Sequence, residues 1–303
     1  MNQQIRPKVT IGLPVYNGEK FIRKNLDSLL SQSYPYFELI ISDNASTDST
    51  SSICKEYEKK DKRIRYIRQK KNMGAVWNYY FVLHQAKNDF FMWAAADDLW
   101  DRTFLEKNVN VLLSNEHVVS CVSKVKWYSL TENKLNKIDS FFQNFLRRVR
   151  SLKSVEVFSL FGSYDKKVTD FLKKGHPNMC YGVFRTDKLQ KSFKNESFVG
   201  NDSALILTVL QFGDCQVIDE TLMFKYYGGM SRKGMLYNAR QFNRGLVGIL
   251  FPEYAYTCWC VKHLGKKLFF RNITYFVQLN LWGEFSLIID LIRILLLHIY
   301  RKL

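Results

Sequence analysis

The feature of this sequence that most constrains its fold is a regular alternation of apolar, strand-like runs with amphipathic, helix-like runs near the N-terminus. The strand-like runs cover residues 9–15, 37–42, 64–68 and 90–95, and the helix-like runs cover residues 19–31, 49–60 and 75–86. Strands that alternate with helices in this order predict a parallel sheet whose connections are right-handed crossovers. With 303 residues, the chain has room for one large α/β domain and an appendage.

The rest of the chain has a less regular pattern, in which helices become dominant toward the C-terminus. We expect strands at residues 118–128 and 216–226, helices at residues 140–174 and 202–212, and a helical pattern after Gly228-Gly229. The predicted fold is therefore an α/β domain over residues 1–235, with a Rossmann-like, mostly parallel sheet flanked by helices. A basic, amphipathic helical extension is predicted over residues 236–303.

The chain is strongly basic, with a formal net charge of +17 at pH 7. Such a balance favours anionic partners, which include nucleic acid, anionic lipid and phosphorylated substrates, although a basic surface can also serve solubility alone. The six cysteines are scattered without a CxxC pair, which is typical of reduced, buried thiols in a cytosolic protein. The stretch MNQQIRPKVT is polar and lacks the apolar core of a signal peptide. We therefore expect a cytoplasmic protein.

Polar residues gather where the predicted strands end. The first strand leads into PVYNGE (14–19), the second into DNASTD (43–48) and the fourth into DD (97–98). The carboxyl ends of parallel strands meet at one edge of a sheet, where α/β proteins bind ligands. The chain has neither GxGxxG after the first strand nor GxxxxGK[ST], so it lacks the usual phosphate cradles. Paired carboxylates at a strand end instead suggest a divalent metal that bridges the protein to a diphosphate, although two adjacent acids can also form a solvated turn.

Four blocks in this region resemble, in order and spacing, the inverting family 2 glycosyltransferases of the GT-A fold. They are TIGLPVYNGEKFIRKNLDSLLSQSY, ELIISDNASTDST, NMGAVWNYYF and FFMWAAADD. A fifth block, FVGNDSALILTVLQFGDCQVIDETLMFKYY, resembles the acceptor-side segment of the same family, and the whole resemblance covers about residues 8–233. It implies a GT-A fold and an enzyme that moves a sugar from a nucleotide-sugar, expected here to be a UDP-sugar, onto an acceptor hydroxyl.

The resemblance also implies which residues contact the nucleotide-sugar. Pro14, Val15 and Tyr16 match the loop that wraps the base, and Asp43 matches the carboxylate that accepts a hydrogen bond from the base edge or the ribose. Asp43 could instead cap the helix that follows it. The two basic residues after the paired glycines could close over the diphosphate or remain solvated. The other residues matched to the donor site are Glu19, Asn72, Gly74, Asp97, Asp98, Arg232 and Lys233.

The acidic pair matches the family's motif for metal and ribose. The resemblance therefore implies a divalent cation, Mn²⁺ or Mg²⁺, with Asp97 as the favoured ligand and Asp98 as the second. The family usually has an acid two residues before Asp97, where this chain has Ala95. Metal-independent transfer is thus the alternative.

Asp202 matches the catalytic base, which takes the proton of the acceptor hydroxyl as its oxygen attacks the anomeric carbon. The nucleotide diphosphate then leaves from the opposite face, with its charge neutralised by the metal. Because Asp202 begins an apolar helix, it could also be a mere first-turn acid of that helix. Tyr181 and Gly182 match a segment that lines the acceptor side, where Gly182 would let the chain approach the sugar closely.

The C-terminal extension combines cations and aromatics with an apolar helix face. Apolar residues between 285 and 299 repeat at three- and four-residue spacing, and cations precede them at Lys262, Lys266, Lys267 and Arg271. This combination suits a membrane interface, but the helix could instead pack on the catalytic domain or join two copies of the chain. The segment QFNRG (241–245) is similar to the QxxRW motif of processive synthases but lacks its tryptophan, so we expect few additions rather than polymer synthesis.

The sequence thus predicts a peripheral enzyme on the inner face of the membrane. Its expected partners are a nucleotide-sugar donor, a glycan or lipid-linked acceptor and an anionic membrane surface, with a homo-oligomer through the C-terminal helices as a further possibility. A nucleotidyltransferase of similar fold would carry a glycine- and lysine-rich phosphate loop near its N-terminus, which the sequence lacks. A nucleic-acid-binding protein would need a recognised binding module or a basic helix free of core-facing residues. We find neither, so we expect no nucleic-acid partner.

Overall fold

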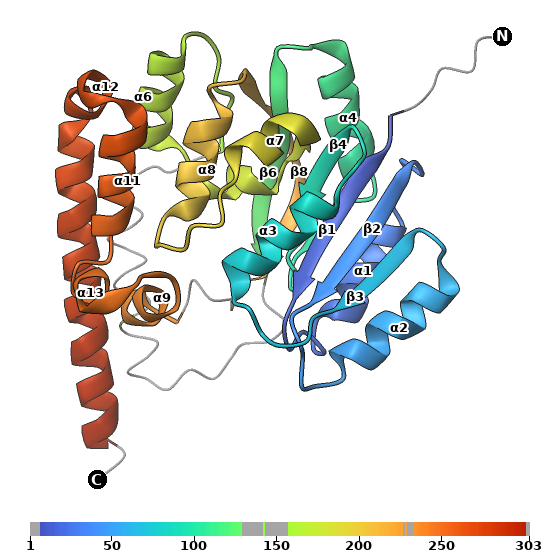
Figure 1. The fold of residues 1–303 in the computed structure, drawn as a ribbon, viewed down its shortest axis with the longest axis horizontal. Coiled ribbons are helices and arrows are strands. Elements are labelled where there is room, and N and C mark those ends of the chain that lie inside the picture. Colours follow the sequence, from blue (N-terminus) through green and yellow to red (C-terminus); the bar gives the residue numbers. More distant parts are fainter. Residues whose placement is uncertain (1–6, 129–141, 143–156, 227, 229–232, 301–303) are drawn as a thin grey trace.

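The structure, a computed structural model, describes residues 7–128, 142, 157–226, 228 and 233–300. Within them the chain forms one eight-stranded sheet with helices on both faces (Figure 1). The strand order is β3-β2-β1-β4-β7-β6-β8-β5. This arrangement confirms the predicted α/β class with a Rossmann-like sheet.

The first half of the sheet is the parallel unit that the sequence predicts. β1 lies between β2 and β4, β3 lies on the outer edge beside β2, and all these pairs are parallel. The strands are β1 (Val9–Val15), β2 (Phe37–Asp43), β3 (Ile64–Arg68) and β4 (Phe90–Trp93). The helices between them are α1 (Ile22–Leu30), α2 (Thr50–Lys60) and α3 (Ala75–Gln85).

The two faces of the sheet have separate cores. Ile11 and Leu13 belong to a hydrophobic cluster with α1 and α2, whereas Phe91 belongs to a second cluster with Val82 of α3. Gly12 lies against this second cluster, where a Cβ would come within 2.6 Å of the Phe91 ring and 2.9 Å of Val82. The missing side chain at Gly12 therefore lets α3 pack closely on β1.

The second half of the sheet is mixed. β7 (Val183–Arg185) is antiparallel to β4 and to β6 (Val118–Tyr128), β8 (Asp214–Tyr226) is parallel to β6, and β5 (Leu99–Trp100) is antiparallel to β8. The elements around it are α4 (Phe104–Ser114), α6 (Tyr164–Lys174), the 3₁₀ helix η1 (Pro177–Tyr181), α7 (Thr186–Ser192) and α8 (Asn201–Val209). The helix expected at residues 140–174 is confirmed from Tyr164 onward. Residues 157–163 are not helical, and nearly all of the earlier part lies outside the described residues.

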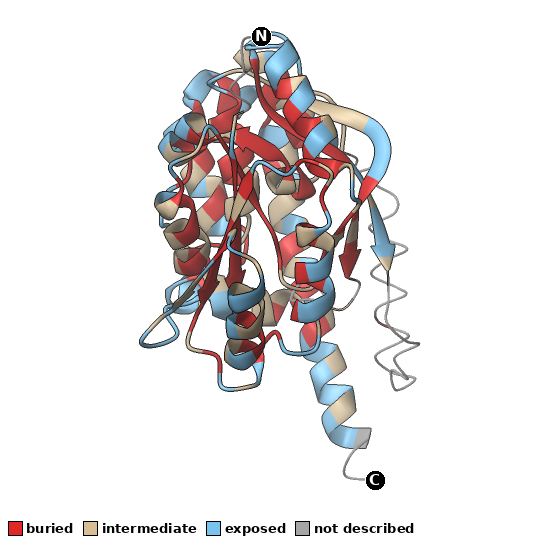
Figure 2. Cartoon of the chain, turned by 90° about the vertical axis from the view of Figure 1, so that its right-hand side faces the viewer, coloured by how far each residue is buried: buried red, intermediate tan, exposed pale blue. Residues whose placement is uncertain are grey.

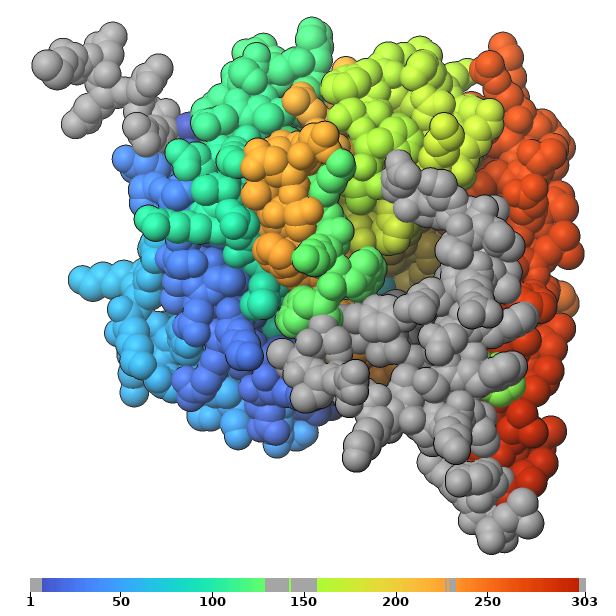
Figure 3. All heavy atoms as spheres, turned by 180° about the vertical axis from the view of Figure 1, so that it is seen from behind, coloured from blue at the N-terminus to red at the C-terminus, as the bar shows by residue number. Residues whose placement is uncertain are grey.

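The C-terminal extension is helical, as predicted, and it lies along one edge of the molecule with β3 and α2 at the opposite edge (Figures 1 and 3). Its helices are α9 (Met235–Phe242), α10 (Gly245–Leu250), α11 (Tyr254–Leu264), α12 (Lys266–Arg271) and α13 (Ile273–Tyr300). Tyr256, Cys260 and Phe276 join the same hydrophobic cluster as Leu205 and Ile206 of α8. The extension therefore shares a core with the region around α8, and the boundary near residue 235 stays a prediction.

Helix α13 packs through one side and exposes the other. Phe276, Leu287 and Asp290 are buried, whereas the last turns of the helix are largely exposed (Figure 2). The apolar face that the sequence indicates between residues 285 and 299 lies mostly on the exposed side. Its exposed members are Phe285, Ile288, Ile292, Leu295, Leu296 and Ile299. Within the described residues, no helix combines the length and apolar character that crossing a bilayer requires.

Candidate active site

Two of the predicted ligand-binding segments meet at one edge of the sheet because they follow neighbouring parallel strands. Val15 ends β1 and is paired directly with Asp43, which ends β2. The amide of Asn44 donates a hydrogen bond of 2.8 Å to the carbonyl oxygen of Val15. Pro14 and Val15 are buried within the strand, and Tyr16 follows with 48% of its surface exposed. The side chain of Tyr16 is therefore accessible to a ligand at this edge.

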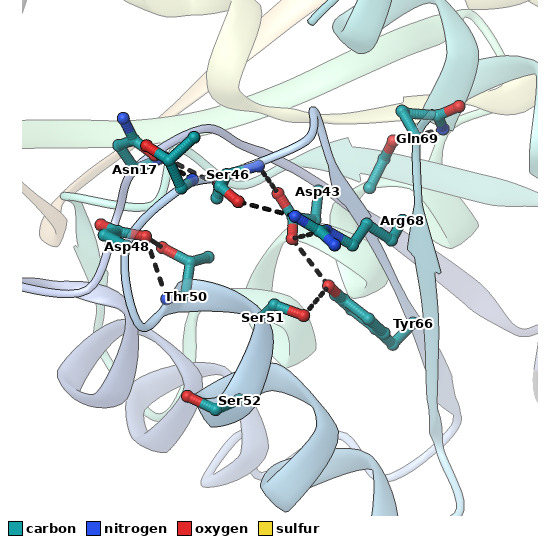
Figure 4. Close-up of polar contacts among 12 residues, drawn as sticks. Asn17, Asp43, Ser46, Asp48, Thr50, Ser51, Ser52, Tyr66, Arg68 and Gln69 are labelled. Atoms are coloured by element: carbon teal, nitrogen blue, oxygen red, sulfur yellow. Dashed lines mark hydrogen bonds and ion pairs between the residues drawn. The ribbon is translucent and has the colours of Figure 1, made fainter. Parts of the chain in front are cut away.

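The carboxylate of Asp43 is fully buried and held from three directions (Figure 4). Its Oδ1 accepts a hydrogen bond of 2.8 Å from the amide of Ser46, and its Oδ2 accepts one of 2.7 Å from the Tyr66 hydroxyl. The Nε of Arg68 lies 3.6 Å from Oδ2. Burial and the bond to Asp43 raise the pKa of Tyr66, so the phenol stays a donor. Asp43 thus shapes the loop after β2 and does not cap α2, whose cap residue is Ser49.

Tyr66 and Arg68 are site residues that the sequence reasoning missed. Both lie on β3, and the sheet register pairs Arg68 with Asp43. The alternation in IRYIR puts Tyr66 and Arg68 on one side of that strand. This signal could have found them, given that β3 is the neighbour of β2.

Glu19 joins the loop after β1 to the start of α2. Its carboxylate accepts a hydrogen bond of 2.9 Å from the amide of Ser49, and its own amide donates one of 3.1 Å to Asp48. A parallel bond runs from the amide of Gly18 to the hydroxyl of Thr50, at 2.8 Å. Glu19 therefore braces the two loops, and its contact with a donor stays a prediction.

Asn72 and Gly74 reach the same edge through Asn44. The side-chain amide of Asn44 donates 2.9 Å to Oδ1 of Asn72 and 3.1 Å to the carbonyl of Gly74, while its Oδ1 accepts 2.9 Å from the amide of Met73. Gly74 has a φ of 88°, in the left-handed region that favours glycine. The structure therefore fastens Asn72 and Gly74 to Asn44, the residue after Asp43, and their contact with a donor stays a prediction.

Asp98 is buried and its carboxylate is already bound within the chain. Its Oδ2 lies 2.7 Å from Nζ of Lys225, and its Oδ1 accepts a hydrogen bond of 3.0 Å from the amide of Tyr226. The ammonium of Lys225 also lies 3.7 Å from the centre of the Tyr181 ring, a cation–π contact. The sequence reasoning missed Lys225, although a single lysine at the end of an apolar strand is a signal for a buried partner.

Asp97 differs from Asp98 in that no side chain among the described residues pairs with its carboxylate. Burial and the neighbouring charge of Asp98 raise its pKa to about 6, and the charge of Lys225 opposes that shift. The backbone around Asp97 is fixed, because its carbonyl accepts 2.7 Å from the Tyr128 hydroxyl. Asn25 of α1 donates 2.8 Å to the carbonyls of both Ala95 and Asp98. The acidic motif is thus held rigidly with one carboxylate available.

The carboxylates of the acidic motif fit a metal ion that is bound together with a phosphorylated substrate. The described residues contain no group of three histidine, cysteine or acidic side chains that could hold a metal ion. Ala95 supplies no ligand, and both oxygens of Asp98 are engaged. Hard cations such as Mg²⁺ bind through one or two carboxylates together with substrate phosphates. Asp97 therefore fits a metal whose other ligands come from a diphosphate and water.

Of the two residues predicted on the acceptor side, Tyr181 ends η1 with its ring beside Lys225, and Gly182 joins η1 to β7. Burial raises the pKa of the Tyr181 phenol well above its ordinary value. A Cβ at Gly182 would come within 2.5 Å of the carbonyl oxygen of Cys121 in β6. Close approach of two backbones therefore explains Gly182, and its contact with a sugar stays a prediction.

Asp202 lies in the first turn of α8, after Gly200, which is in the left-handed conformation. Its Oδ1 accepts a hydrogen bond of 2.8 Å from the amide of Ser203. Burial raises its pKa, and the positive charge of Lys225 acts in the opposite direction. Glu253, at the start of α11, is buried, and burial together with the charge of Asp202 raises the Glu253 pKa to about 8. Lys225 thus acts electrostatically on both Asp97 and Asp202.

Among the described residues, no contact joins the acidic motif to the two basic residues that are expected near the diphosphate. Lys233 is exposed and its ammonium contacts Tyr237 of α9, at 4.6 Å from the ring centre. Arg232 lies outside the described residues. Their role at the diphosphate stays a prediction.

The comparison of sequences decides the family. Residues 10–192, more than half of the chain, match glycosyl transferase family 2. The chain belongs to this family. A Bacillus subtilis protein named as a putative teichuronic acid biosynthesis glycosyltransferase, TuaG, is 32% identical to this chain over 136 residues. That match covers 45% of this chain and 52% of TuaG.

A second relative and two solved structures agree. The glycosyltransferase GlyA of Streptococcus pneumoniae is 34% identical over 99 residues, which are 33% of this chain and 14% of GlyA. The chain thus spans about half of TuaG and less of GlyA. The mannosyltransferase PcManGT of Pyrobaculum calidifontis, solved with GDP-Man and Mn²⁺, matches 95% of this chain and 75% of its own with a TM-score of 0.61 and 18% identity. Staphylococcus aureus TarS 1-349, solved with UDP-GlcNAc, matches 90% and 81% with a TM-score of 0.55 and 16% identity. These structures confirm the GT-A fold.

The buried pair of Lys225 and Asp98 predicts a measurable asymmetry in stability. Replacing one member of a buried ion pair leaves an uncompensated charge, so Lys225→Met should lower the free energy of unfolding by about 3–5 kcal/mol. The double variant Lys225→Met, Asp98→Asn should recover most of that loss. Urea titration measures both.

The exposed pair of Lys107 and Glu220 is the matched control, with 37% and 53% of the two side chains exposed. Lys107→Met should change the free energy of unfolding by less than about 1 kcal/mol. A Lys225→Met protein as stable as the wild type would show that Asp98 needs no counter-ion.

Proposed function

We propose that the chain is an inverting glycosyltransferase that moves a sugar from a nucleotide-sugar, a UDP-sugar in the simplest case, onto an acceptor hydroxyl in polysaccharide biosynthesis. The observation that carries this proposal is the grouping of carboxylates around Lys225. Among the described residues no side chain pairs with the carboxylate of Asp97, and the positive charge of Lys225 acts on the pKa of both Asp97 and Asp202, which lies at the start of α8. Family membership supplies the reaction class.

The nucleotide end of the donor would lie at the carboxyl edge of β1 and β2. The exposed Tyr16 would cover the base, and the carboxylate of Asp43 would accept a hydrogen bond from the base or ribose. Oδ1 of Asp43 has one protein donor, the Ser46 amide, and a second lone pair for a ligand, whereas Oδ2 is held by Tyr66 and Arg68. Pro14, Val15, Asn72 and Gly74 would form the backbone wall around it.

Asp97 would hold a divalent metal, Mn²⁺ or Mg²⁺, with the diphosphate of the donor. A metal bound there neutralises charge on the leaving diphosphate. Asp98 would support this site indirectly, since its oxygens already bind Lys225 and Tyr226. Mn²⁺ in the structure of PcManGT, a chain of the same fold, supports a divalent ion.

Asp202 would act as the general base on the acceptor hydroxyl. Inversion needs one carboxylate on the acceptor side, opposite the leaving diphosphate. Burial raises the pKa of Asp202, which makes the carboxylate a stronger proton acceptor once it is ionised. Tyr181, packed on Lys225, would line the path between the donor and the base.

The acceptor would be a glycan or a lipid-linked saccharide, met by a cytoplasmic enzyme that is peripheral on the inner face of the membrane. The exposed apolar side of α13 and the exposed cations Lys262, Lys266, Lys267 and Arg271 support this location. The cysteines are free and four of the six are buried, in keeping with a reducing compartment. Thermal-shift and hydrolysis screens against a panel of nucleotide-sugars, with and without Mn²⁺, test the whole proposal. No response to any of them would refute it.

Asp43→Asn should weaken UDP binding by about 1.5–3 kcal/mol in calorimetry, which is the usual value of a charged hydrogen bond. Tyr66→Phe is the matched control because it removes a neighbour of the carboxylate and leaves the carboxylate itself. It should keep near-wild-type affinity. Equal losses in the two variants would show that Asp43 acts by shaping the loop, without touching the nucleotide.

Mn²⁺ should raise the affinity for UDP, and Asp97→Asn should reduce this gain at least about tenfold. The reason is that even residues that only orient the ligands of a metal change metal affinity by about 10–100-fold. Asp98→Asn should keep the Mn²⁺ effect and lose stability, since Asp98 is paired with Lys225. Full wild-type activity in excess chelator would contradict the metal assignment.

Asp202→Asn should lower turnover by about 10²–10⁴-fold, the usual effect of losing a general base, while UDP binding persists. The matched control is Asp187→Asn, because Asp187 is likewise a first-turn acid, at the start of α7. Its turnover should stay within about twofold of wild type. Similar small losses in both variants would mean that Asp202 is only a first-turn acid.

A further inference from the structure

The loop that leads into α8, which we call the Asp202 loop because Asp202 follows it in the first turn of α8, is fastened to the C-terminal helices by one buried side chain. Oδ1 of Asn243 accepts a hydrogen bond of 2.8 Å from the amide of Val199. Its Nδ2 donates 2.6 Å to the carbonyl of Gly248 and 2.8 Å to that of Pro252. Asn243 therefore ties the approach to α8 to α10 and to the turn that follows it. This residue belongs to the QFNRG segment, so that segment has a structural role beside the acceptor side.

Two further contacts fasten the same loop. The hydroxyl of Ser197 donates 2.8 Å to the carbonyl of Phe242, the last residue of α9. A Cβ at Gly200 would lie 3.1 Å from the Tyr256 ring, so α11 packs directly under the residue that precedes α8. The position of Asp202 thus depends on α9, α10 and α11.

The outer side of these helices is apolar and exposed. Between Asn243 and Glu253, which are both buried, the short helix α10 and the turn after it present four large apolar side chains to the outside. These residues are Leu246 at 69% exposed, Val247 at 57%, Leu250 at 47% and Phe251 at 50%. A contiguous exposed patch of this kind is unusual on a monomeric protein and marks an interaction site.

Helix α13, which lies along the edge of the molecule (Figure 1), presents a second set of exposed apolar side chains. Gly283 lies against Glu253, because a Cβ there would be 2.8 Å from the Glu253 Cγ. The middle of α13 is therefore in contact with the start of α11. On the side opposite the buried Phe276 and Asp290, α13 exposes Val277, Leu281, Phe285 and Ile288 at three- to four-residue spacing. We call these four residues and those of α10 and its turn the interfacial surface.

The charges around the interfacial surface are almost all positive. The acids among residues 233–300 are Glu253, Glu284 and Asp290, and two of these are buried. The exposed lysines and arginines are Lys233, Arg240, Arg244, Lys262, Lys266, Lys267 and Arg271. A second copy of the chain would bring like charges together, which disfavours a dimer through this face. An anionic bilayer offers the opposite charge at the polar level and an apolar interior for the exposed side chains.

We propose that the interfacial surface docks on an anionic lipid bilayer and thereby brings the bilayer to the Asp202 side of the active site. The inference rests on the proposed function in one respect, namely that Asp202 faces the acceptor. The surface begins at Leu246, three residues after Asn243, which is bonded to the loop before α8, whereas β3 and α2, beside the proposed nucleotide site, lie at the far side of the molecule (Figure 3). An acceptor held in the bilayer would therefore reach the base, while the donor enters from the water.

The test replaces exposed side chains, so that folding is preserved. The full chain with Leu246→Ser, Val247→Ser and Leu281→Ser is compared with wild type in flotation with vesicles of phosphatidylcholine and phosphatidylglycerol. We expect wild-type binding that weakens with salt and in pure phosphatidylcholine vesicles, and a loss of at least about tenfold in the triple variant. Leu113→Ser, at a leucine of α4 that is 53% exposed, is the matched control and should bind like wild type.

A label then reports which surface enters the bilayer. In a Cys258→Ser background, chosen because Cys258 is exposed, an environment-sensitive dye on Leu246→Cys should shift to the blue with vesicles, and the same dye on Leu113→Cys should not. Equal shifts at both sites, or vesicle binding by the triple variant equal to that of wild type, overturn the proposal. So does a wild-type dimer that the triple variant abolishes, combined with no vesicle binding.

Hydrolysis of nucleotide-sugar in water separates the two claims. The triple variant should retain it at the wild-type rate. A wild-type chain that hydrolyses a nucleotide-sugar but ignores vesicles would refute the interfacial surface alone. A chain that binds vesicles but responds to no nucleotide-sugar would refute the proposed function alone.

Discussion

The ion pair of Lys225 and Asp98 is the interaction on which the rest of the site depends. It joins the end of β8 to the loop after β4, two segments far apart in the sequence, and both partners are buried. A buried carboxylate without a counter-ion would be strongly destabilising, so the lysine is required wherever Asp98 is retained. The pair fixes the acidic motif from one side, and Asn25 and Tyr128 fix its backbone from two others. Asp97 is left as the carboxylate with no side-chain partner among the described residues.

This arrangement separates two acids that are adjacent in the sequence. Asp98 is committed to the protein, whereas Asp97 is partly desolvated and poised at a raised pKa. The same lysine contacts the Tyr181 ring and lowers the pKa of Asp202 against the effect of burial. In the proposed site, one fixed cation would thus couple the donor end to the acceptor end. A preorganised charge of this kind need not reorganise during transfer, which is the usual source of electrostatic stabilisation in enzymes.

The C-terminal helices have two roles that follow from their two sides. Their inner side completes the core around α8 and fastens the Asp202 loop through Asn243. Their outer side leaves large apolar side chains exposed beside cations. Exposed apolar patches that are rimmed by polar residues mark interaction sites on protein surfaces. The inner contacts therefore fix the position of the outer surface relative to the active site.

The sequence by itself determined the parallel half of the sheet, because long apolar strands and amphipathic helices carry strong periodicity there. β1, β3 and β6 have the bounds that their patterns predict. It also determined that Asp43 and the acidic pair stand at strand ends, since that follows from strand limits alone. β7 was missed because a strand of three residues has no measurable period.

Only the tertiary structure decided what each acid does. The pairing of Asp98 with Lys225 joins residues 127 positions apart, and no local pattern encodes such a contact. Likewise, the register between β2 and β3 decided that Tyr66 and Arg68 hold Asp43. The helical pattern of the extension is local, so the sequence indicates it. Which of its sides is buried depends on the shape of the α8 surface that it meets, which the chain acquires only on folding.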